Sequence, residues 1–379
     1  MRIHFFQPEQ FNRTENKTNP FFDPLIEVCQ HNNIPYKVFI AEKQQTRNGY
    51  GNKAGNSWIL VLPEILGFRL IKWFHLPSRF VWYIVGFIIN VLTFGKYRAD
   101  ICITVAGIHL EILQGIAPKA RLIDLQHGVI FPYHTGYFEQ DGKLQPRLSE
   151  NIQREYWVYG QGFKNVFFFN PQNREFLTNR VFIVGDLSGK QSGSFSGHKF
   201  SENCSNLVIS LQFKPDMGND VNRDLKESLR AFLGDNQKFF ADNGIQVFLR
   251  HHPRYCNCID LSDVLADFPD LQTLQGNQVR NMDQVFCHVT WTSTTVFEYA
   301  EAGIPTLFLS VASLYDDGIF SSCYHYPYHE QSCREIMELI GEETESRAEV
   351  LHSWYQQYYQ PFDERDVTGL FKNKQKAGE

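Results

Sequence analysis

The chain has 379 residues, of which 43% are hydrophobic, and a formal net charge of −6. This length exceeds one small domain and fits two α/β domains that each bury a core. The mildly acidic balance argues against a dedicated nucleic-acid binder, and the eight scattered cysteines, without paired C-x-x-C spacing, indicate neither a zinc site nor a disulfide framework.

Strand-like and helix-like segments alternate along the first half of the chain, which is the pattern of an α/β fold. The N-terminal run MRIHFF leads directly into a strand without the long apolar core of a signal peptide, so we expect a cytoplasmic protein. The predicted elements here are strands at 2–6, 36–40, 101–105, 121–125, 156–159 and 181–184 and a helix at 22–31.

A second α/β series follows a Gly- and Ser-rich segment at 185–205, which is typical of a linker. We therefore expect an N-terminal domain at 1–190, a C-terminal domain at 191–350, and a C-terminal helix with a polar tail at 351–379. Two such domains facing each other would leave a cleft between their loop-bearing edges. The second series comprises predicted strands at 206–212, 245–249, 285–289 and 306–309 and helices at 221–243 and 296–302.

Four hydroxyl residues in a row, Thr292, Ser293, Thr294 and Thr295, join a predicted strand to a predicted helix. Ligands of parallel α/β sheets bind beyond the carboxyl ends of the strands. Hydroxyls and the free N–H groups of a helix start both suit a phosphate. The alternative is that one hydroxyl simply caps the helix.

The segment VFLRHHPR places Arg250, His251, His252 and Arg254 directly after a predicted strand. Pro253 disfavours helical backbone in the residue before it, so these side chains stay in a turn at the strand end. Two Arg and two His in one turn predict an anion site. A solvated basic turn is the alternative.

A third polar turn, QHG, follows the strand at 121–125, and its glycine permits a tight turn that exposes His127. Both a catalytic and a structural role are open for this histidine. The loop FPYHTGYFEQDGK downstream carries aromatic residues together with Glu139 and Asp141. That composition suits contacts with sugar faces and hydroxyls, and an ordinary surface loop is the alternative.

Together, and in this order, QHG, HP and TSTTVFEYAEAGIPTLFL resemble motifs of the GT-B glycosyltransferases of bacterial surface polysaccharides. The nearest likenesses are bacterial sialyltransferases and polysialyltransferases, Kdo transferases and CDP-glycerol glycerophosphotransferases. The resemblance implies two Rossmann-like domains with an inter-domain cleft. It implies a nucleotide-sugar donor, by likeness a CMP-activated acidic sugar such as sialic acid, Kdo or a related nonulosonic acid. The implied acceptor is a capsule, lipopolysaccharide or other surface glycan.

The resemblance also implies roles for residues in the second domain. His252 and the hydroxyls at 292–295 would hold the donor phosphate, and Glu298 would bind the ribose. No D-x-D follows a predicted strand, so we expect no metal and no cofactor beyond the nucleotide-sugar co-substrate. Cations and hydroxyls can stabilise the charge that develops on the leaving phosphate.

The catalytic base is open between two parts of the first domain. In the glycerophosphotransferases a histidine in a similar HG turn acts as base, and His127 matches it. Sialyltransferases instead carry an acidic pair followed by glycine, ahead of HP. The sequence EQDG, with Glu139 and Asp141, has this order but contains Gln140, whereas DDG at 316–318 comes after HP.

Other function classes fit the same residues. One is a CDP-glycerol-type glycerophosphotransferase, and another is an NDP-sugar transferase or epimerase of the same fold. A third is a non-catalytic protein of polysaccharide assembly, in which the polar clusters would have no chemical role.

The most apolar stretch of the chain, 58–98, predicts contact with a membrane surface. Its densest part, 80–95, is shorter than the roughly 20 residues of a spanning helix, and Asn90 interrupts it. Mixed aromatic and basic residues predict peripheral binding to the anionic inner face of the cytoplasmic membrane. The alternative is ordinary buried helices of the first domain. The mixture consists of Trp73, Phe74, Trp82 and Tyr83 with Arg69, Lys72, Arg79, Lys96 and Arg98.

Overall fold

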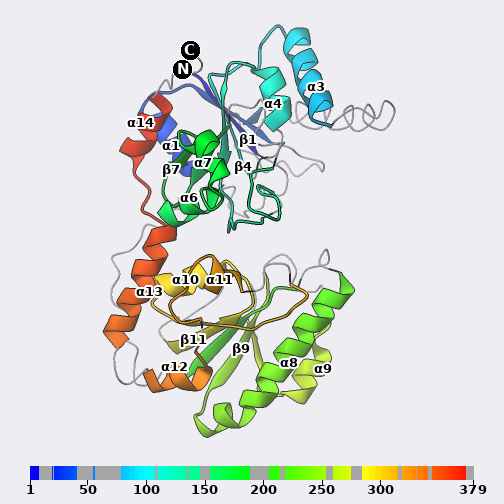
Figure 1. The fold of residues 1–379 in the computed structure, drawn as a ribbon, viewed down its shortest axis with the longest axis vertical. Coiled ribbons are helices and arrows are strands. Elements are labelled where there is room, and N and C mark those ends of the chain that lie inside the picture. The colour runs from blue at the N-terminus through cyan, green and yellow to red at the C-terminus, as the bar shows by residue number, and fades with distance from the viewer. Residues whose placement is uncertain are drawn as a thin grey trace. The chain divides into compact units, whose positions relative to one another are not determined.

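The chain divides into two α/β units (Figure 1). Unit 1 comprises Met1–Gln191 and Tyr358–Glu379, and unit 2 comprises Ser192–Gln357. The computed structural model describes residues 1–7, 19, 21–40, 54–55, 78–105, 107, 110–134, 136–145, 154–187, 205–213, 218–252, 259–274, 284–314, 318–329, 331–339 and 344–372.

Unit 1 is built on a seven-stranded sheet in the order β3-β2-β1-β4-β5-β6-β7. Every pair in it is parallel. Strands of a parallel sheet are covered on both faces, which is why β1 and β4 read as almost continuous apolar runs. The strands are β1 (Ile3–Gln7), β2 (Tyr36–Ile40), β3 (Ala54–Gly55), β4 (Ile101–Val105), β5 (Arg121–Leu125), β6 (Arg154–Val158) and β7 (Val181–Ile183).

The helices of unit 1 come from both ends of the chain. Helix α14 belongs to the C-terminal piece and lies beside α1 (Figure 1). There Glu364 bonds to His31 Nδ1 at 3.2 Å and accepts from Asn32 Nδ2 at 3.3 Å. The helices are α1 (Asp23–His31), α3 (Ser78–Leu92), α4 (Leu110–Ile116), α6 (Gln161–Phe167), α7 (Gln172–Leu177) and α14 (Glu364–Lys372).

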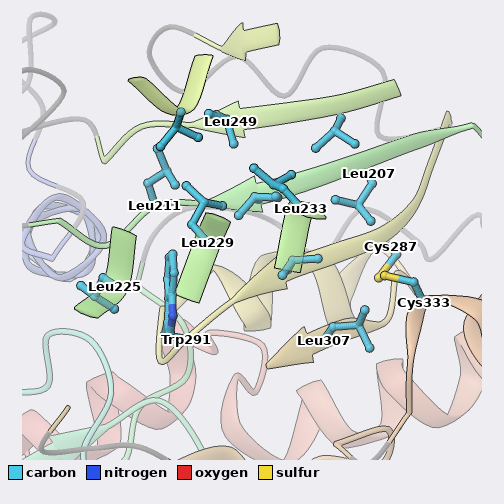
Figure 2. Packing of buried hydrophobic residues seen from close by; sticks show 14 of the residues in the cluster. Leu207, Leu211, Leu225, Leu229, Leu233, Leu249, Cys287, Trp291, Leu307 and Cys333 are labelled. Atoms are coloured by element: carbon cyan, nitrogen blue, oxygen red, sulfur yellow. The ribbon is translucent and has the colours of Figure 1, made fainter. Parts of the chain in front are cut away.

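Unit 2 has a five-stranded parallel sheet in the order β10-β9-β8-β11-β12. Leucines at every fourth position of α8 pack on one face of it, together with Leu207 and Leu249 from the strands (Figure 2). The strands are β8 (Asn206–Ser210), β9 (Gln246–Arg250), β10 (Gln272–Leu274), β11 (Val285–Thr290) and β12 (Thr306–Phe308), and the helices are α8 (Asn219–Asp242), α9 (Ser262–Asp267), α10 (Thr295–Glu301), α11 (Ile319–Ser322), α12 (Cys333–Leu339) and α13 (Thr344–Tyr358).

The C-terminal region differs from the expected separate helix and tail at 351–379. The structure assigns this region partly to unit 2 and partly to unit 1, with the change at Tyr358. The reason is packing: Trp354 stacks on Phe297 of unit 2 at 4.9 Å between ring centroids, whereas Phe371 packs on Trp157 of unit 1 at 5.4 Å. Most of the expected linker, 188–204, lies outside the described residues.

Candidate functional site

The hydroxyl turn follows β11 at the carboxyl edge of the unit 2 sheet, and Gln212 anchors it. The Thr292 N–H donates to Gln212 Oε1 at 2.6 Å, and Gln212 Nε2 donates back to Thr292 Oγ1 at 3.2 Å. Thr292 is therefore buried. Ser293 and Thr295 are half-buried, with Thr295 Oγ1 donating to Ser293 Oγ at 2.9 Å, and Thr294 is exposed. Three of the four hydroxyl residues are thus at least partly exposed.

Behind this turn a neutral histidine joins three strands. His288 is fully buried, and its ring nitrogens bond to Thr306 Oγ1 at 2.9 Å and Ser210 Oγ at 2.8 Å. Its ring stacks on Tyr299 at 3.9 Å. Burial, and then the charge of Arg250, hold the pKa of His288 well below its usual range. His288 therefore supports the turn without adding charge.

Arg250 is the buried cation of the site and fixes the carboxylate of Glu298. Its Nη2 donates to Glu298 Oε2 at 3.1 Å, and the Arg250 side chain is only 8% exposed against 35% for Glu298. Burial lowers the pKa of Arg250, but the Glu298 carboxylate and the Tyr299 hydroxyl more than offset this, so its pKa is raised. Arg250 Nη1 is buried without a hydrogen-bond partner in the described part of the chain.

The two histidines after Arg250 stay at the strand end. His251 and His252 are both half-buried, and burial lowers the pKa of His251. The predicted partners Pro253 and Arg254 lie outside the described residues. The structure thus gathers Arg250, His252 and the hydroxyl turn at one edge of one sheet.

In unit 1, Gln126 shapes the turn that carries His127. The Gln126 Nε2 donates to the Gly128 carbonyl at 2.7 Å, and its Oε1 accepts the Tyr159 N–H at 3.0 Å. The Tyr159 hydroxyl donates to the Gln126 carbonyl at 2.7 Å. Gly128 has φ 84°, a left-handed backbone that glycine adopts without strain. His127 is half-buried at the carboxyl end of β5 in this braced turn.

The two carboxylates of the aromatic loop lie in a short exposed hairpin closed by the bridge between Phe138 and Leu144. Asp141 Oδ2 pairs with Lys143 Nζ at 2.8 Å, and this hydrogen bond lowers the pKa of Asp141. A lowered pKa makes a carboxylate a weaker base. Glu139 is exposed in the same hairpin. Of the DDG at 316–318, the two aspartates lie outside the described residues.

Gln212 and His288 support the candidate site, and the sequence prediction missed them. The available signal was a polar residue at every second position of an apolar strand-like run. It occurs at Ser210 and Gln212, and again at His288 and Thr290. Residues two apart point to the same face of a strand. Such a pattern predicts a polar seam on one face of the sheet, although the hydrogen-bond partners depend on strand order.

No protein-family model matches the chain, and no curated protein matches it by sequence. Solved structures do match its fold. A UDP-GlcNAc 2-epimerase of Methanocaldococcus jannaschii, in complex with UDP-GlcNAc and UDP, is similar with a TM-score of 0.52 and 11% identity, over 98% of this chain and 100% of the other.

Two proteins of surface-polymer synthesis are similar to the same degree. A histidine variant of the wall teichoic acid polymerase TagF matches with a TM-score of 0.51 and 12% identity, over 97% of this chain and 86% of the other. The lipopolysaccharide outer core galactosyltransferase WaaB matches with a TM-score of 0.50 and 11% identity, over 98% and 99%. With its two parallel sheets, the chain therefore has the GT-B fold of two Rossmann-like domains.

Proposed function

We propose that this protein is a glycosyltransferase that takes a sugar from a nucleotide-sugar donor bound by unit 2. The observation that carries this is the Arg250–Glu298 pair beside the hydroxyl turn. Arg250 holds one oxygen of Glu298, while the side chain stays partly exposed. A carboxylate held in this way can accept hydrogen bonds from a ribose diol, as acidic residues of dinucleotide-binding folds do.

The neighbouring hydroxyls complete the donor site. Thr294 and Thr295 precede Glu298 by four and three residues and therefore share its face of α10. The donor phosphate binds these hydroxyls and Ser293, with His252 supplying further hydrogen bonds. These groups would stabilise the charge that develops as the nucleotide leaves.

We assign the base to His127. The pKa of an effective general base lies near the working pH. A histidine in a rigid turn meets this condition better than Asp141, which is paired with Lys143. The acceptor in this proposal is a hydroxyl of a capsule, lipopolysaccharide or other surface glycan. Within the described residues no group of three or more metal-ligating side chains occurs. We propose a metal-independent reaction, so activity is expected to survive excess EDTA.

Motif likeness supports a CMP-activated donor, whereas the epimerase neighbour binds a UDP sugar. A thermal-shift series with CMP, CDP, UMP, UDP and GDP and their 2′-deoxy forms separates these donors. We expect CMP or CDP to raise the melting temperature and the 2′-deoxy forms to do so less. The variant Glu298→Gln should lose this preference for ribose, whereas the control Glu338→Gln, exposed on α12 of the same unit, should keep it.

Stabilisation by uridine nucleotides alone would replace the CMP assignment and leave the fold-based proposal standing. If no nucleotide shifts the melting temperature, that result would favour the non-catalytic assembly protein over the transferase. Product analysis with donor alone tests the second candidate, a UDP-sugar 2-epimerase, which needs no acceptor. For the base, His127→Asn should lower turnover by about 10²- to 10⁴-fold without changing nucleotide binding.

A further inference from the structure

Helix α3 presents large apolar side chains to solvent. Its other face carries Val81, Val85 and Ile89 into the core of unit 1. Large apolar side chains exposed elsewhere in the described residues, such as Phe169 and Val350, are isolated in the sequence. We define the α3 apolar face as Tyr83 (37% exposed), Phe87 (46%), Ile88 (46%), Val91 (54%), Leu92 (71%) and Phe94 (97%).

Two glycines fix the orientation of this face, because α3 and α4 touch backbone to backbone. A Cβ on Gly86 would lie 2.1 Å from the Ile112 carbonyl oxygen, and a Cβ on Gly115 would lie 2.2 Å from the Tyr83 carbonyl oxygen. Neither contact leaves room for α3 to rotate and bury its outer side chains. The helices lie side by side in Figure 1. The α3 apolar face therefore stays outward.

Helix α3 is followed by a residue with strained backbone whose aromatic ring is exposed. Phe94 has φ 49°, a left-handed backbone at a helix end where glycine is usual. The hydrogen bond from the Gly95 N–H to the Asn90 carbonyl, 2.8 Å, closes this turn. For a bulky residue such a conformation is an outlier, and outliers of this kind persist at functional positions. Here it holds the Phe94 ring almost fully in solvent.

The charged residues in the sequence that spans α3 are basic, up to the exposed Asp100 that follows Arg98. No Asp or Glu occurs between positions 65 and 99, whereas Lys96 and Arg98 are exposed just after the α3 apolar face. Arg98 Nε donates to Asn90 Oδ1 at 2.8 Å, which fixes its side chain beside the helix end. Of the other expected basic and aromatic residues, Arg69, Lys72, Trp73 and Phe74 lie outside the described residues, as does the side chain of Arg79.

We propose that the α3 apolar face inserts into the surface of an anionic phospholipid bilayer. Amphipathic surfaces that combine exposed Leu and Phe with nearby Lys and Arg bind at the level of the lipid headgroups. A helix of 15 residues is about 22 Å long, less than the roughly 30 Å of a bilayer core. Within the described residues, no helix combines the length and apolar character needed to span a membrane. This helix therefore lies along the membrane.

A second copy of the chain is a poorer occupant than lipid. In a two-fold symmetric dimer each surface meets its own copy. Lys96 and Arg98 of both copies would then share one interface and repel one another, with Asp100 as the nearest acidic residue in the sequence. An anionic bilayer removes that repulsion, because its headgroups carry the opposite charge.

Sedimentation of the full chain with vesicles tests this proposal. The vesicles are phosphatidylcholine alone, or phosphatidylcholine with about one third phosphatidylglycerol. We expect the protein to pellet with the anionic vesicles and to be released in part at high salt. The double variant Leu92→Glu/Phe94→Glu should reduce vesicle binding about tenfold or more. Phe169→Glu, at another exposed phenylalanine of unit 1 (63% exposed), is the matched control and should bind as the unaltered protein does.

Three outcomes would overturn the proposal. The first is equal recovery in the supernatant with and without anionic lipid. The second is a lipid-free dimer, seen by analytical ultracentrifugation, that the double variant converts to monomer. The third is a large drop in melting temperature in the double variant without vesicle binding by the unaltered protein, which would show that the chain itself covers this face. Because nucleotide binding is measured separately in unit 2, these outcomes are distinguishable from failure of the proposed transferase function.

Discussion

Asp124 is a buried carboxylate that the proposed mechanism does not use. It is 1% exposed within β5, where its Oδ1 accepts the Gly107 N–H at 2.6 Å and its Oδ2 has no hydrogen-bond partner in the described structure. Burial raises the pKa of Asp124 to about 6, although the charge of Arg154 and the Gly107 N–H act in the opposite direction. The folded state therefore holds the proton more tightly than the unfolded chain.

Asp124 should make the protein less stable as the pH rises from about 4 to about 6. Its pKa in the fold lies above the unfolded value of 3.8, so the folded state binds more protons in that window. The loss over the whole titration is about 3 kcal/mol, of which about 2 kcal/mol falls between pH 4 and pH 6. Denaturant unfolding at a series of pH values, compared between the unaltered chain and Asp124→Asn, measures it. Parallel curves for the two proteins would contradict this assignment.

His4 acts in the opposite direction over the same pH range. It is fully buried in β1, and burial, with the charges of Lys37 and Arg2, lowers its pKa to about 4. Stability linked to this histidine is complete above pH 6.5 and is lost as the pH falls through about 4. The pH profile of the unaltered chain is therefore a sum of opposing effects, and the Asp124→Asn comparison isolates one of them.

At the scale of elements, the contact between α3 and α4 depends on glycine. We expect Gly115→Ala to destabilise the protein by about 2 kcal/mol or more. The new methyl group would clash with the Tyr83 carbonyl and the Phe87 N–H, because both would lie closer than van der Waals contact. The same substitution at Gly234 of α8 is the control. Nothing lies within 4 Å of a Cβ there, so Gly234→Ala should stabilise the protein by about 0.5 to 1 kcal/mol. Denaturant unfolding measures both, and equal effects would disprove the close contact.

The strands were predictable because buried parallel strands are short apolar runs. Those at 36–40, 101–105 and 121–125 were predicted with the bounds that the structure shows. The two- and three-residue edge strands β3 and β10 were missed, since such short segments have no periodicity to detect. The hydroxyl turn and Arg250 could be placed at strand ends because strand ends are visible in the sequence. The role of Gln212 was not predictable, because it depends on β8 lying beside β11.

At the scale of the whole molecule, unit 2 is an insertion in unit 1. The core of unit 2, including Leu229 and Trp291, is formed by its own residues. Unit 1 instead needs its second piece: Arg121 donates to the Leu370 carbonyl at 2.8 Å as well as pairing with Glu155. A local pattern in the sequence cannot reveal that the C-terminal piece packs on unit 1, because the bonded residues are about 250 positions apart.

This division predicts different behaviour for isolated parts. Residues 192–357 should unfold in one cooperative transition, because their core is complete. Residues 1–191 alone should melt at a lower temperature than the same residues joined to 358–379 by a Gly/Ser linker, since the latter supply α14. Calorimetry of the three proteins checks this. Equal melting temperatures for the two versions of unit 1 would show that α14 adds nothing to its stability.

The insertion also sets an order of events during translation. Ribosomes release the chain from its N-terminus, so the first piece of unit 1 emerges long before α14. Until then Trp157 lacks the Phe371 ring, and the paired Arg121 lacks its carbonyl acceptors on α14. Unit 2 emerges later but carries its whole core. The later-made unit is therefore the first able to finish folding, and the nascent first piece must persist incomplete, open to chaperones, while it does so.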